Sequence, residues 1–313
     1  MALTTTGTMP SPIKAYYEKR FLMRAEINFI GEQLGEPGRI PKGEGKTVVW
    51  NRMTNPTAKD TALTEGTDPT PSGLSAAMVS ATLSQYGNYE QVTDLLELTS
   101  VDTTIKEAID TLAYEAALSI DTVIWKTIVS GGTLMVASAA YSNSAGFTPS
   151  RNSIDANDTF SVYDLRRARR QLKRFSAKPH TKDRYVAAAH PDVIFDLQGD
   201  TNWINAHIYT EKGIDAVYNG EAGELFGTRF VETENPQFVL TNSGSAGTEV
   251  YTTYIMGKEF FGVSKLQNLE TYVDSPSPRS ALRLYSDIGW KASFAVKVLN
   301  DSFAIRVESA ASQ

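Results

Sequence analysis

Residues 289–310 read "GWKASFAVKVLNDSFAIRVESA", the most regular stretch of the sequence. Apolar side chains take every second position over 290–298 and again over 303–307. This period of two is typical of strands that bury one face. Asn300 and Asp301 separate the two runs, so the stretch predicts a β-hairpin with these residues in its turn.

A single long helix is predicted for residues 102–130, "DTTIKEAIDTLAYEAALSIDTVIWKTIVS". The stretch has neither Gly nor Pro, its apolar residues recur at helical spacing, and Gly131 and Gly132 follow it. At about 1.5 Å per residue the helix would be on the order of 43 Å long and would act as a spine. We expect the hairpin to place five core residues beneath it: Trp290, Phe294, Val296, Phe303 and Ile305.

Residues 46–92 predict a projecting arm. A short strand, "KTVVWNRM" (46–53), is followed by a turn-rich segment and then by "LSAAMVSATLSQYGNYEQVTD" (74–94), a predicted strand with many Ser and Thr on both faces. A ribbon that is polar on both faces buries little by itself. We therefore expect a long hairpin that needs a partner to lie on.

The remaining helices and strands do not alternate regularly along the sequence. Ser11 and Pro12 begin a helix that ends before Gly35, and a basic helix is predicted over 161–175. Later we expect a buried strand over 184–189, a helix from about Pro191, a strand over 228–233, and one strand over 251–265. This order predicts an α+β fold with mainly antiparallel sheets.

Composition excludes several classes of protein. The chain has 313 residues, 41% hydrophobic and 21% charged, with a formal charge of −6 and no cysteine. This rules out disulfides, thiolate catalysis and cysteine-bound zinc, and it provides no overall positive field for nucleic acid or membrane. No stretch reaches the length of a membrane helix or signal peptide.

Motif candidates for enzymatic chemistry all fail. "GEGKT" (43–47) has Ile40 where a phosphate-binding loop needs its first glycine, and "HPD" (190–192) is explained by a strand end followed by a helix start. The three histidines have no metal-ligand spacing. We therefore expect no catalytic, cofactor or metal site and no enzyme.

The strongest electrostatic feature is "LRRARRQLKRFSAKPHTKDR" (165–184), in which nine cations face one Asp. Three interpretations remain open: a solvated basic face, pairing with acidic segments of neighbouring subunits such as "NGEAGE" and "ETE", or contact with phosphates. The acid-rich segment 211–249 has few cations, which favours pairing between subunits.

Several stretches resemble the N-four-type major capsid family of short-tailed bacteriophages. They are "LTEGTDP", "LSAAMVSATLSQYGNYEQVTD", "YVAAAHPDVIFDLQGDTNWINA", "YNGEAGELFGTRFVET" and "GWKASFAVKVLND". The resemblance implies the Johnson fold of tailed-phage and herpesvirus major capsid proteins. Its expected parts are an N-terminal arm and helix (1–45), an extended β-hairpin loop (46–92), a peripheral domain with the spine (93–158), an axial domain (159–250), and a return to the peripheral domain (251–313).

The resemblance implies a major capsid protein that self-assembles into pentamers and hexamers of an icosahedral head around double-stranded DNA, bound without sequence specificity. Expected partners are further copies of the chain, a separate scaffolding protein, a portal and a decoration protein; no membrane is expected. The location would be the virion capsid, made and assembled in the bacterial host cytoplasm. The alternatives are an encapsulin-like shell or a soluble α+β enzyme.

Ten residues are predicted to lie at contacts between subunits. They come from the arm, the basic helix and the acidic segment: Trp50, Met53, Tyr86, Tyr89, Arg166, Arg169, Arg170, Arg174, Glu221 and Glu224. Aromatic and arginine side chains are typical of such contacts.

Overall fold

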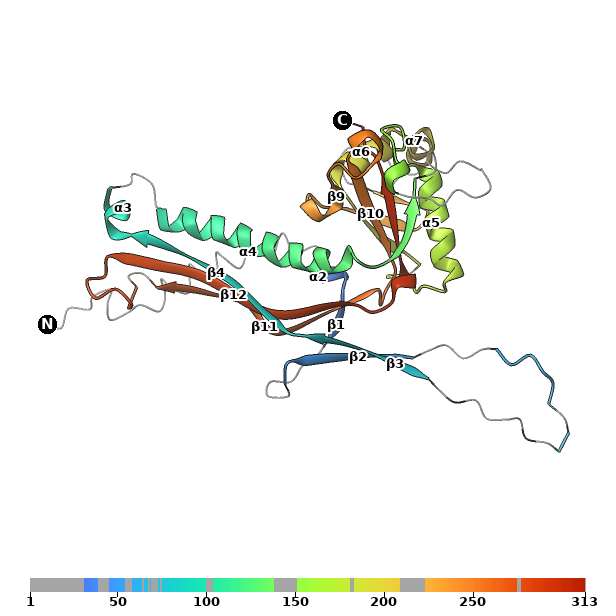
Figure 1. The fold of residues 1–313 in the computed structure, drawn as a ribbon, viewed down its shortest axis with the longest axis horizontal. Helices are drawn as coiled ribbons and strands as arrows, with labels where there is room; N and C mark the ends of the chain where they lie inside the picture. The colour runs from blue at the N-terminus through green and yellow to red at the C-terminus, as the bar shows by residue number, and fades with distance from the viewer. Residues whose placement is uncertain are drawn as a thin grey trace.

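The computed structural model describes residues 31–38, 45–53, 58–63, 65–66, 68, 73, 75–99, 104–137, 151–180, 183–208, 223–274 and 277–312. Two sheets lie at an angle to each other, and a two-stranded arm extends from the place where they meet (Figure 1). Of the helix predicted from Ser11, only the last turn, α2 (Gly31–Leu34), belongs to the described residues.

The elongated part of the molecule is a four-stranded sheet with one long helix along it (Figure 1). Its strands, in spatial order, are β1 (Glu36–Gly38), β11 (Phe261–Asp274), β12 (Tyr285–Val298) and β4 (Ser84–Thr93). The helix is α4 (Thr104–Ile128), and the short α3 (Asp94–Thr99) lies at the far end. The prediction of a spine helix is confirmed; its 25 residues correspond to about 37 Å.

The core of this part lies between α4 and the sheet. Leu112, Ile124 and Trp125 of the helix are fully or almost fully buried, and Trp290 and Phe294 of β12 belong to the same cluster. Val296 and Phe303 are partly buried against it. The apolar face of β12 therefore meets the apolar stripe of the helix, as its period of two predicts.

The other part contains a seven-stranded sheet covered by helices. The strand order is β5 (Thr133–Val136), β13 (Ala304–Ser309), β10 (Val250–Met256), β6 (Tyr185–Ala189), β8 (Thr228–Glu232) and β7 (Glu224–Leu225), with β9 (Val239–Leu240) beside β10. Three helices pack here: α5 (Val162–Arg174), α6 (Pro191–Gly199) and α7 (Thr201–Ile208). Short 3-10 turns are η1 (Arg151–Ser153), η2 (Pro236–Phe238) and η3 (Ser245–Gly247).

The predicted C-terminal hairpin is wrong. β12 pairs with β11 and β4, whereas β13 pairs with β10 and β5, so the two strands belong to different sheets. Between them lies the 3-10 turn η4 (Asp301–Phe303), and the Asn300 side chain accepts a hydrogen bond from the Ser302 N–H at 3.2 Å. This turn redirects the chain, and Ile305 consequently lies in the core beneath α5 rather than beneath the spine.

The chain crosses between the sheets at three places: 129–132, 257–260 and 299–303. The single strand predicted over 251–265 is therefore also wrong, because β10 and β11 lie in different sheets. The interval 251–313 is divided between both sheets, and β5 carries part of 93–158 into the seven-stranded one. Backbone hydrogen bonds join the crossings, from Gly257 N–H to Phe303 O at 2.9 Å and from Leu299 N–H to Phe260 O at 2.8 Å.

The arm is a separate two-stranded sheet, in which β2 (Thr47–Met53) pairs antiparallel with β3 (Ala76–Thr82). The described residues 58–63, which come between the two strands, lie away from the body (Figure 1). The predicted strand over 74–94 is broken at Leu83, because β4 joins the four-stranded sheet. The projecting hairpin is thus shorter than the interval 46–92.

Candidate assembly interface

The root of the arm is attached to the body by Trp50. A Cβ atom placed on Gly262 would lie 2.6 Å from its indole, and one placed on Gly38 would lie 2.8 Å from it, so only glycine allows this approach. Trp50 is half-buried within its own chain. Trp50 therefore fixes the direction of the arm, and its predicted place at a contact between subunits stays a prediction.

Beyond this anchor the arm is almost completely exposed. Met53 and Met78 expose 69% and 74% of their surface, and only Val48 is buried among the strand residues. Large exposed apolar side chains of this kind mark surfaces that contact a partner. The predicted contact residue Met53 thus lies on a surface that this chain leaves uncovered.

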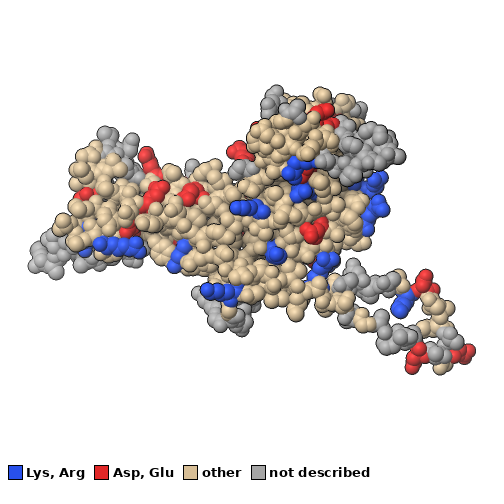
Figure 2. All heavy atoms as spheres, in the orientation of Figure 1, with Lys and Arg blue, Asp and Glu red and all other residues tan. Residues whose placement is uncertain are grey.

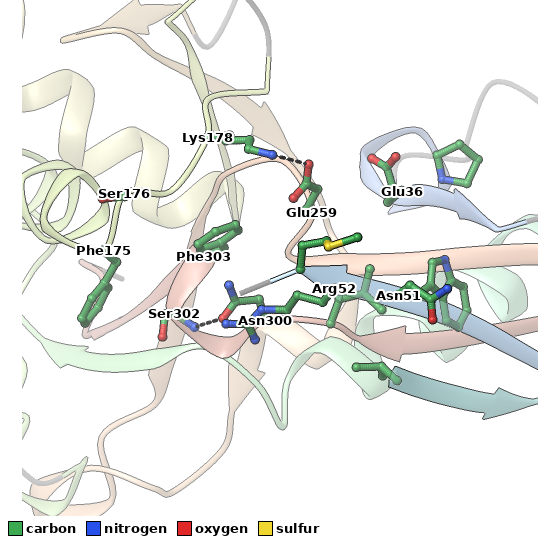
Figure 3. Close-up of a pocket in the computed structure, with 15 residues that line it drawn as sticks. Glu36, Asn51, Arg52, Phe175, Ser176, Lys178, Glu259, Asn300, Ser302 and Phe303 are labelled. Atoms are coloured by element: carbon green, nitrogen blue, oxygen red, sulfur yellow. Dashed lines mark hydrogen bonds and ion pairs between the residues drawn. The ribbon is translucent and has the colours of Figure 1, made fainter. Parts of the chain in front are cut away.

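A cavity of about 670 Å³ lies beside the arm root, between the two sheets (Figure 3). Arg52 reaches from β2 toward the turn with Asn300 and Ser302, while Lys178 and Glu259 form an ion pair of 3.0 Å on the opposite side. The lining mixes both charges with apolar side chains. The cavity forms a concave surface where the arm joins the body.

The edge strand β4 carries the two predicted tyrosines. Tyr86 packs on Phe294 with ring centroids 5.0 Å apart and so supports the core of its own chain. Tyr89 is 60% exposed on the other face. Within the described residues β4 pairs only with β12, so its outer edge is open to another strand.

Helix α5 begins with a capping box, in which the Ser161 side chain accepts from the Asp164 N–H and the Asp164 carboxylate accepts from the Ser161 N–H. Val162, Leu165, Ala168 and Leu172 bury one face. The opposite face displays arginines and a lysine at the outer edge of the molecule (Figure 2). The predicted basic helix is confirmed.

The arginines of this helix have different environments. Arg167 lies 3.3 Å from the buried Asp164, whereas the Arg169 Nε is buried without a hydrogen-bond partner and its guanidinium lies against Gly227. Arg166 is stacked over the Phe226 ring at 5.7 Å. Arg169 therefore packs against its own chain, and its predicted role at a contact between subunits stays a prediction.

Among the predicted acidic contact residues, Glu224 forms an ion pair of 2.9 Å with Arg184 of the same chain. Glu221 lies outside the described residues. Two further exposed carboxylates of this region are Glu232 and Glu234, in the "ETE" sequence at the end of β8.

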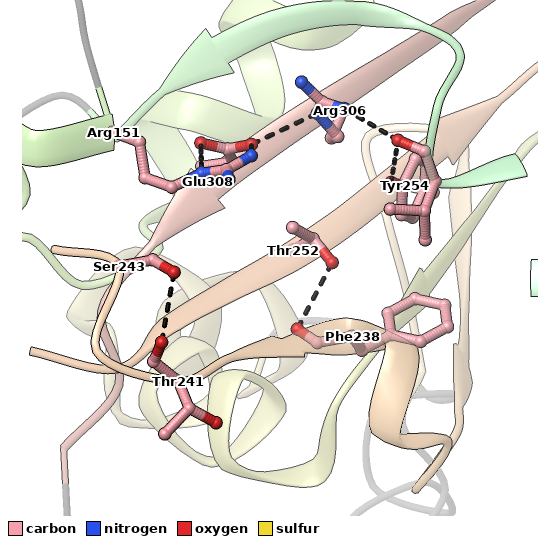
Figure 4. A network of polar contacts seen from close by, with 9 residues as sticks. Arg151, Phe238, Thr241, Ser243, Thr252, Tyr254, Arg306 and Glu308 are labelled. Carbon is pink, nitrogen blue, oxygen red and sulfur yellow. Dashed lines mark hydrogen bonds and ion pairs between the residues drawn. The ribbon is translucent and has the colours of Figure 1, made fainter. Parts of the chain in front are cut away.

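A buried ion cluster lies in the seven-stranded sheet (Figure 4). The fully buried Glu308 carboxylate lies 2.6 and 2.9 Å from two guanidinium nitrogens of Arg151 and 3.2 Å from Arg306. Arg306 donates to the Val129 carbonyl at the end of the spine, at 2.7 Å. Burial raises the pKa of the neighbouring Tyr254 to about 12, so this phenol stays neutral.

Sequence reasoning missed an apolar surface at the far end of the four-stranded sheet. Leu95 and Leu98 of α3 expose 67% and 81% of their surface, and Leu282 exposes 78%. The Asp94 N–H donates to the Leu284 carbonyl at 2.9 Å, which brings the two segments together. The signal that could have revealed it is the leucine-rich "DLLELT" beside polar strands.

Side chains suited to catalysis or metal binding do not form a cluster in the described part of the chain. His190 caps α6 by accepting from the Asp192 N–H, and no cluster of three His, Asp or Glu side chains suited to a metal occurs there. Among the same residues no helix is long and apolar enough to span a membrane. The outstanding surfaces are therefore the exposed arm, the open edge, the basic helix and the apolar tip.

Comparison with known proteins identifies a family. The family model described as phage capsid protein matches residues 76–307. The capsid of cyanophage Pam1 is similar with a TM-score of 0.66 and 14% identity, over 86% of this chain and 86% of that chain. The capsid of cyanophage P-SCSP1u gives 0.66 and 16%, over 89% and 87%.

A third similar structure is a virus-like particle from Pyrococcus furiosus, with a TM-score of 0.53 and 11% identity over 95% of this chain and 100% of that chain. No curated protein sequence matches. The likeness to these structures establishes the Johnson fold of tailed-phage capsid proteins. Because the family model covers most of the sequence, the chain belongs to the phage capsid protein family.

Proposed function

We propose that this chain is the major capsid protein of a tailed phage and assembles as pentamers and hexamers into a closed icosahedral shell around double-stranded DNA. The observation that supports this most directly is the match to the phage capsid family over residues 76–307. The exposed arm fits the role, since a two-stranded ribbon with so little buried surface is stable only against a partner.

The finer assignment rests on the sequence stretches quoted above, which support a place in the N-four-type group of short-tailed phages. A scaffolding protein, a portal and a decoration protein would complete the particle, and assembly would take place in the cytoplasm of a bacterial host. The arm would cover the adjacent subunit, while the apolar tip with Leu95 and Leu98 would meet neighbouring capsomers.

Electron microscopy of the purified chain, expressed alone and together with its scaffolding protein, tests the proposal. Closed shells with fivefold and sixfold capsomers are expected. Sedimentation as a discrete monomer at millimolar concentration under all conditions would contradict it. Particles filled with a cargo protein instead of DNA would favour an encapsulin-like compartment.

A further inference from the structure

Four cations of α5 form a continuous stripe. Arg166, Arg170, Lys173 and Arg174 follow one another at helical spacing, and all four are exposed. They extend over about 12 Å of the helix. None has an ion-pair partner among the described residues, in contrast to Arg167 in the same helix.

This stripe opposes the stability of its own helix. Like charges four residues apart, as in the pairs 166 with 170 and 170 with 174, each cost a few tenths of a kcal/mol. Arg166 is in addition held in place by the Phe226 ring. A row of uncompensated cations on one helix, with Arg166 held by an aromatic ring, is therefore suited to an anionic partner.

A matching acidic corner lies elsewhere in the same domain. Glu232 and Glu234 are exposed and have no cation partner among the described residues. The backbone between them is fixed, because the Thr233 N–H donates to the Ala189 carbonyl at 3.0 Å. The Asn235 side chain donates to Asp121 of the spine at 3.2 Å. The two carboxylates are thus presented from a rigid segment rather than from a free loop.

The two features lie on opposite sides of the domain. In Figure 1 α5 forms its right-hand side, whereas β9, which follows the acidic corner, forms the left-hand side. Among the described residues, no ion pair joins the stripe to the acidic corner within one chain. In a ring of identical copies each contact is heterologous, so the right side of one copy faces the left side of the next.

We propose that the basic stripe of α5 (Arg166, Arg170, Lys173, Arg174) binds the acidic corner (Glu232, Glu234) of the adjacent copy within a capsomer. This inference rests on the proposed function, since it requires a ring of copies. The partner is a second copy rather than nucleic acid, because residues 223–249 contain four Glu and only Arg229 as a cation. Each copy would use both surfaces, so every copy in the ring adds one such contact.

Charge exchange tests the pairing. The variant with Arg170→Glu and Arg174→Glu, and the variant with Glu232→Lys and Glu234→Lys, should each raise the concentration for half-maximal shell assembly at least about tenfold. The variant with all four changes should return to within about threefold of the parent, because the pairs are restored with reversed sign. Light scattering and electron microscopy follow assembly, and circular dichroism of the unassembled chains checks folding.

A matched control for the arginine variant changes the exposed Lys258 and Lys297 to Glu, which alters the net charge by the same amount and sign at positions away from the stripe. Its concentration for half-maximal shell assembly should be close to that of the parent chain. If a reversed variant fails to fold, the neutral change of Arg170 and Arg174 to Gln replaces it and should remove most of the salt dependence of assembly.

Two results would overturn the pairing while leaving the proposed function intact. One is normal assembly of the Glu232 and Glu234 variant, with loss of only encapsulated nucleic acid in the arginine variant, which would assign the stripe to phosphates. The other is a variant with all four changes that needs as high a concentration for half-maximal shell assembly as either double variant. Failure of the parent itself to form shells would instead refute the proposed function.

Discussion

Neutralising the buried Glu308 by Glu308→Gln should destabilise the unassembled chain strongly. The carboxylate is completely buried and holds Arg151 through two nitrogens and Arg306 at 3.2 Å. Arg306 also reaches the Val129 carbonyl of the spine. Glutamine keeps the shape of the side chain but leaves two guanidinium groups without their anion.

The expected magnitude follows from burial and chain length. Removing the anion of a buried ion pair costs about 3–5 kcal/mol, because Arg306, whose side chain is only 16% exposed, then stays largely desolvated without its partner. An unfolding entropy of about 2.1 cal/mol/K per residue gives roughly 0.66 kcal/mol/K for a chain of 313 residues. The unfolding temperature should therefore fall by about 5–8 °C.

Thermal unfolding of the unassembled chain, followed by circular dichroism and by the fluorescence of the buried Trp125, measures the effect. Glu90→Gln is the matched control, since Glu90 is exposed on β4 and should change the midpoint by less than about 1 °C. Adding Arg306→Met to Glu308→Gln should raise the free energy of unfolding by at least about 1 kcal/mol over that of Glu308→Gln alone, because it removes the buried cation that has lost its anion. A midpoint for Glu308→Gln equal to that of the control would refute the reasoning.

Three further outcomes are expected. Trp50→Ala should lower the free energy of unfolding of the body by only about 1–2 kcal/mol. It should nevertheless make the arm at least roughly fivefold more sensitive to limited proteolysis, because the indole anchors the arm on Gly262. Deletion of residues 55–73 should leave a folded chain, by circular dichroism, that forms no shells in electron micrographs. Burial raises the pKa of Asp121, so the folded state binds a proton at this carboxyl more tightly than the unfolded state does. The contribution of Asp121 to the free energy of unfolding therefore decreases as pH rises through its pKa in the folded state. Asp121→Asn should therefore lower the free energy of unfolding, measured with urea, by more at about pH 3.5 than at about pH 7.

The elements themselves were predictable where periodicity was long and uninterrupted. The spine and α5 repeat their apolar residues at helical spacing, so both were predicted at nearly their observed positions, and the alternation over 290–298 predicted all of β12 except its first residues, from Tyr285. Periodicity reports which face is buried but not which strand is the neighbour. For that reason β12 and β13 were predicted as one hairpin although they lie in different sheets.

The candidate contacts were predictable only in part. Composition identified the basic helix, but charge alone could not separate Arg170, which faces solvent, from Arg169, whose Nε is buried beside Gly227. Nor could it reveal that Glu224 is used by Arg184 within the chain. Glu308 stands at a polar position of an alternating strand and is nevertheless buried, because both faces of β13 are covered.

The three chain crossings between the sheets have a mechanical consequence. Force applied to one sheet by a neighbouring copy reaches the other through three chain segments that act side by side, and the Gly257 to Phe303 and Leu299 to Phe260 hydrogen bonds couple two of them. The Gly132 N–H also donates to the Asp301 carboxylate at 3.1 Å, which links the first crossing to the third. Internal pressure would thus be shared among three covalent links, so the junction resists shear and no single peptide segment bears the full tension.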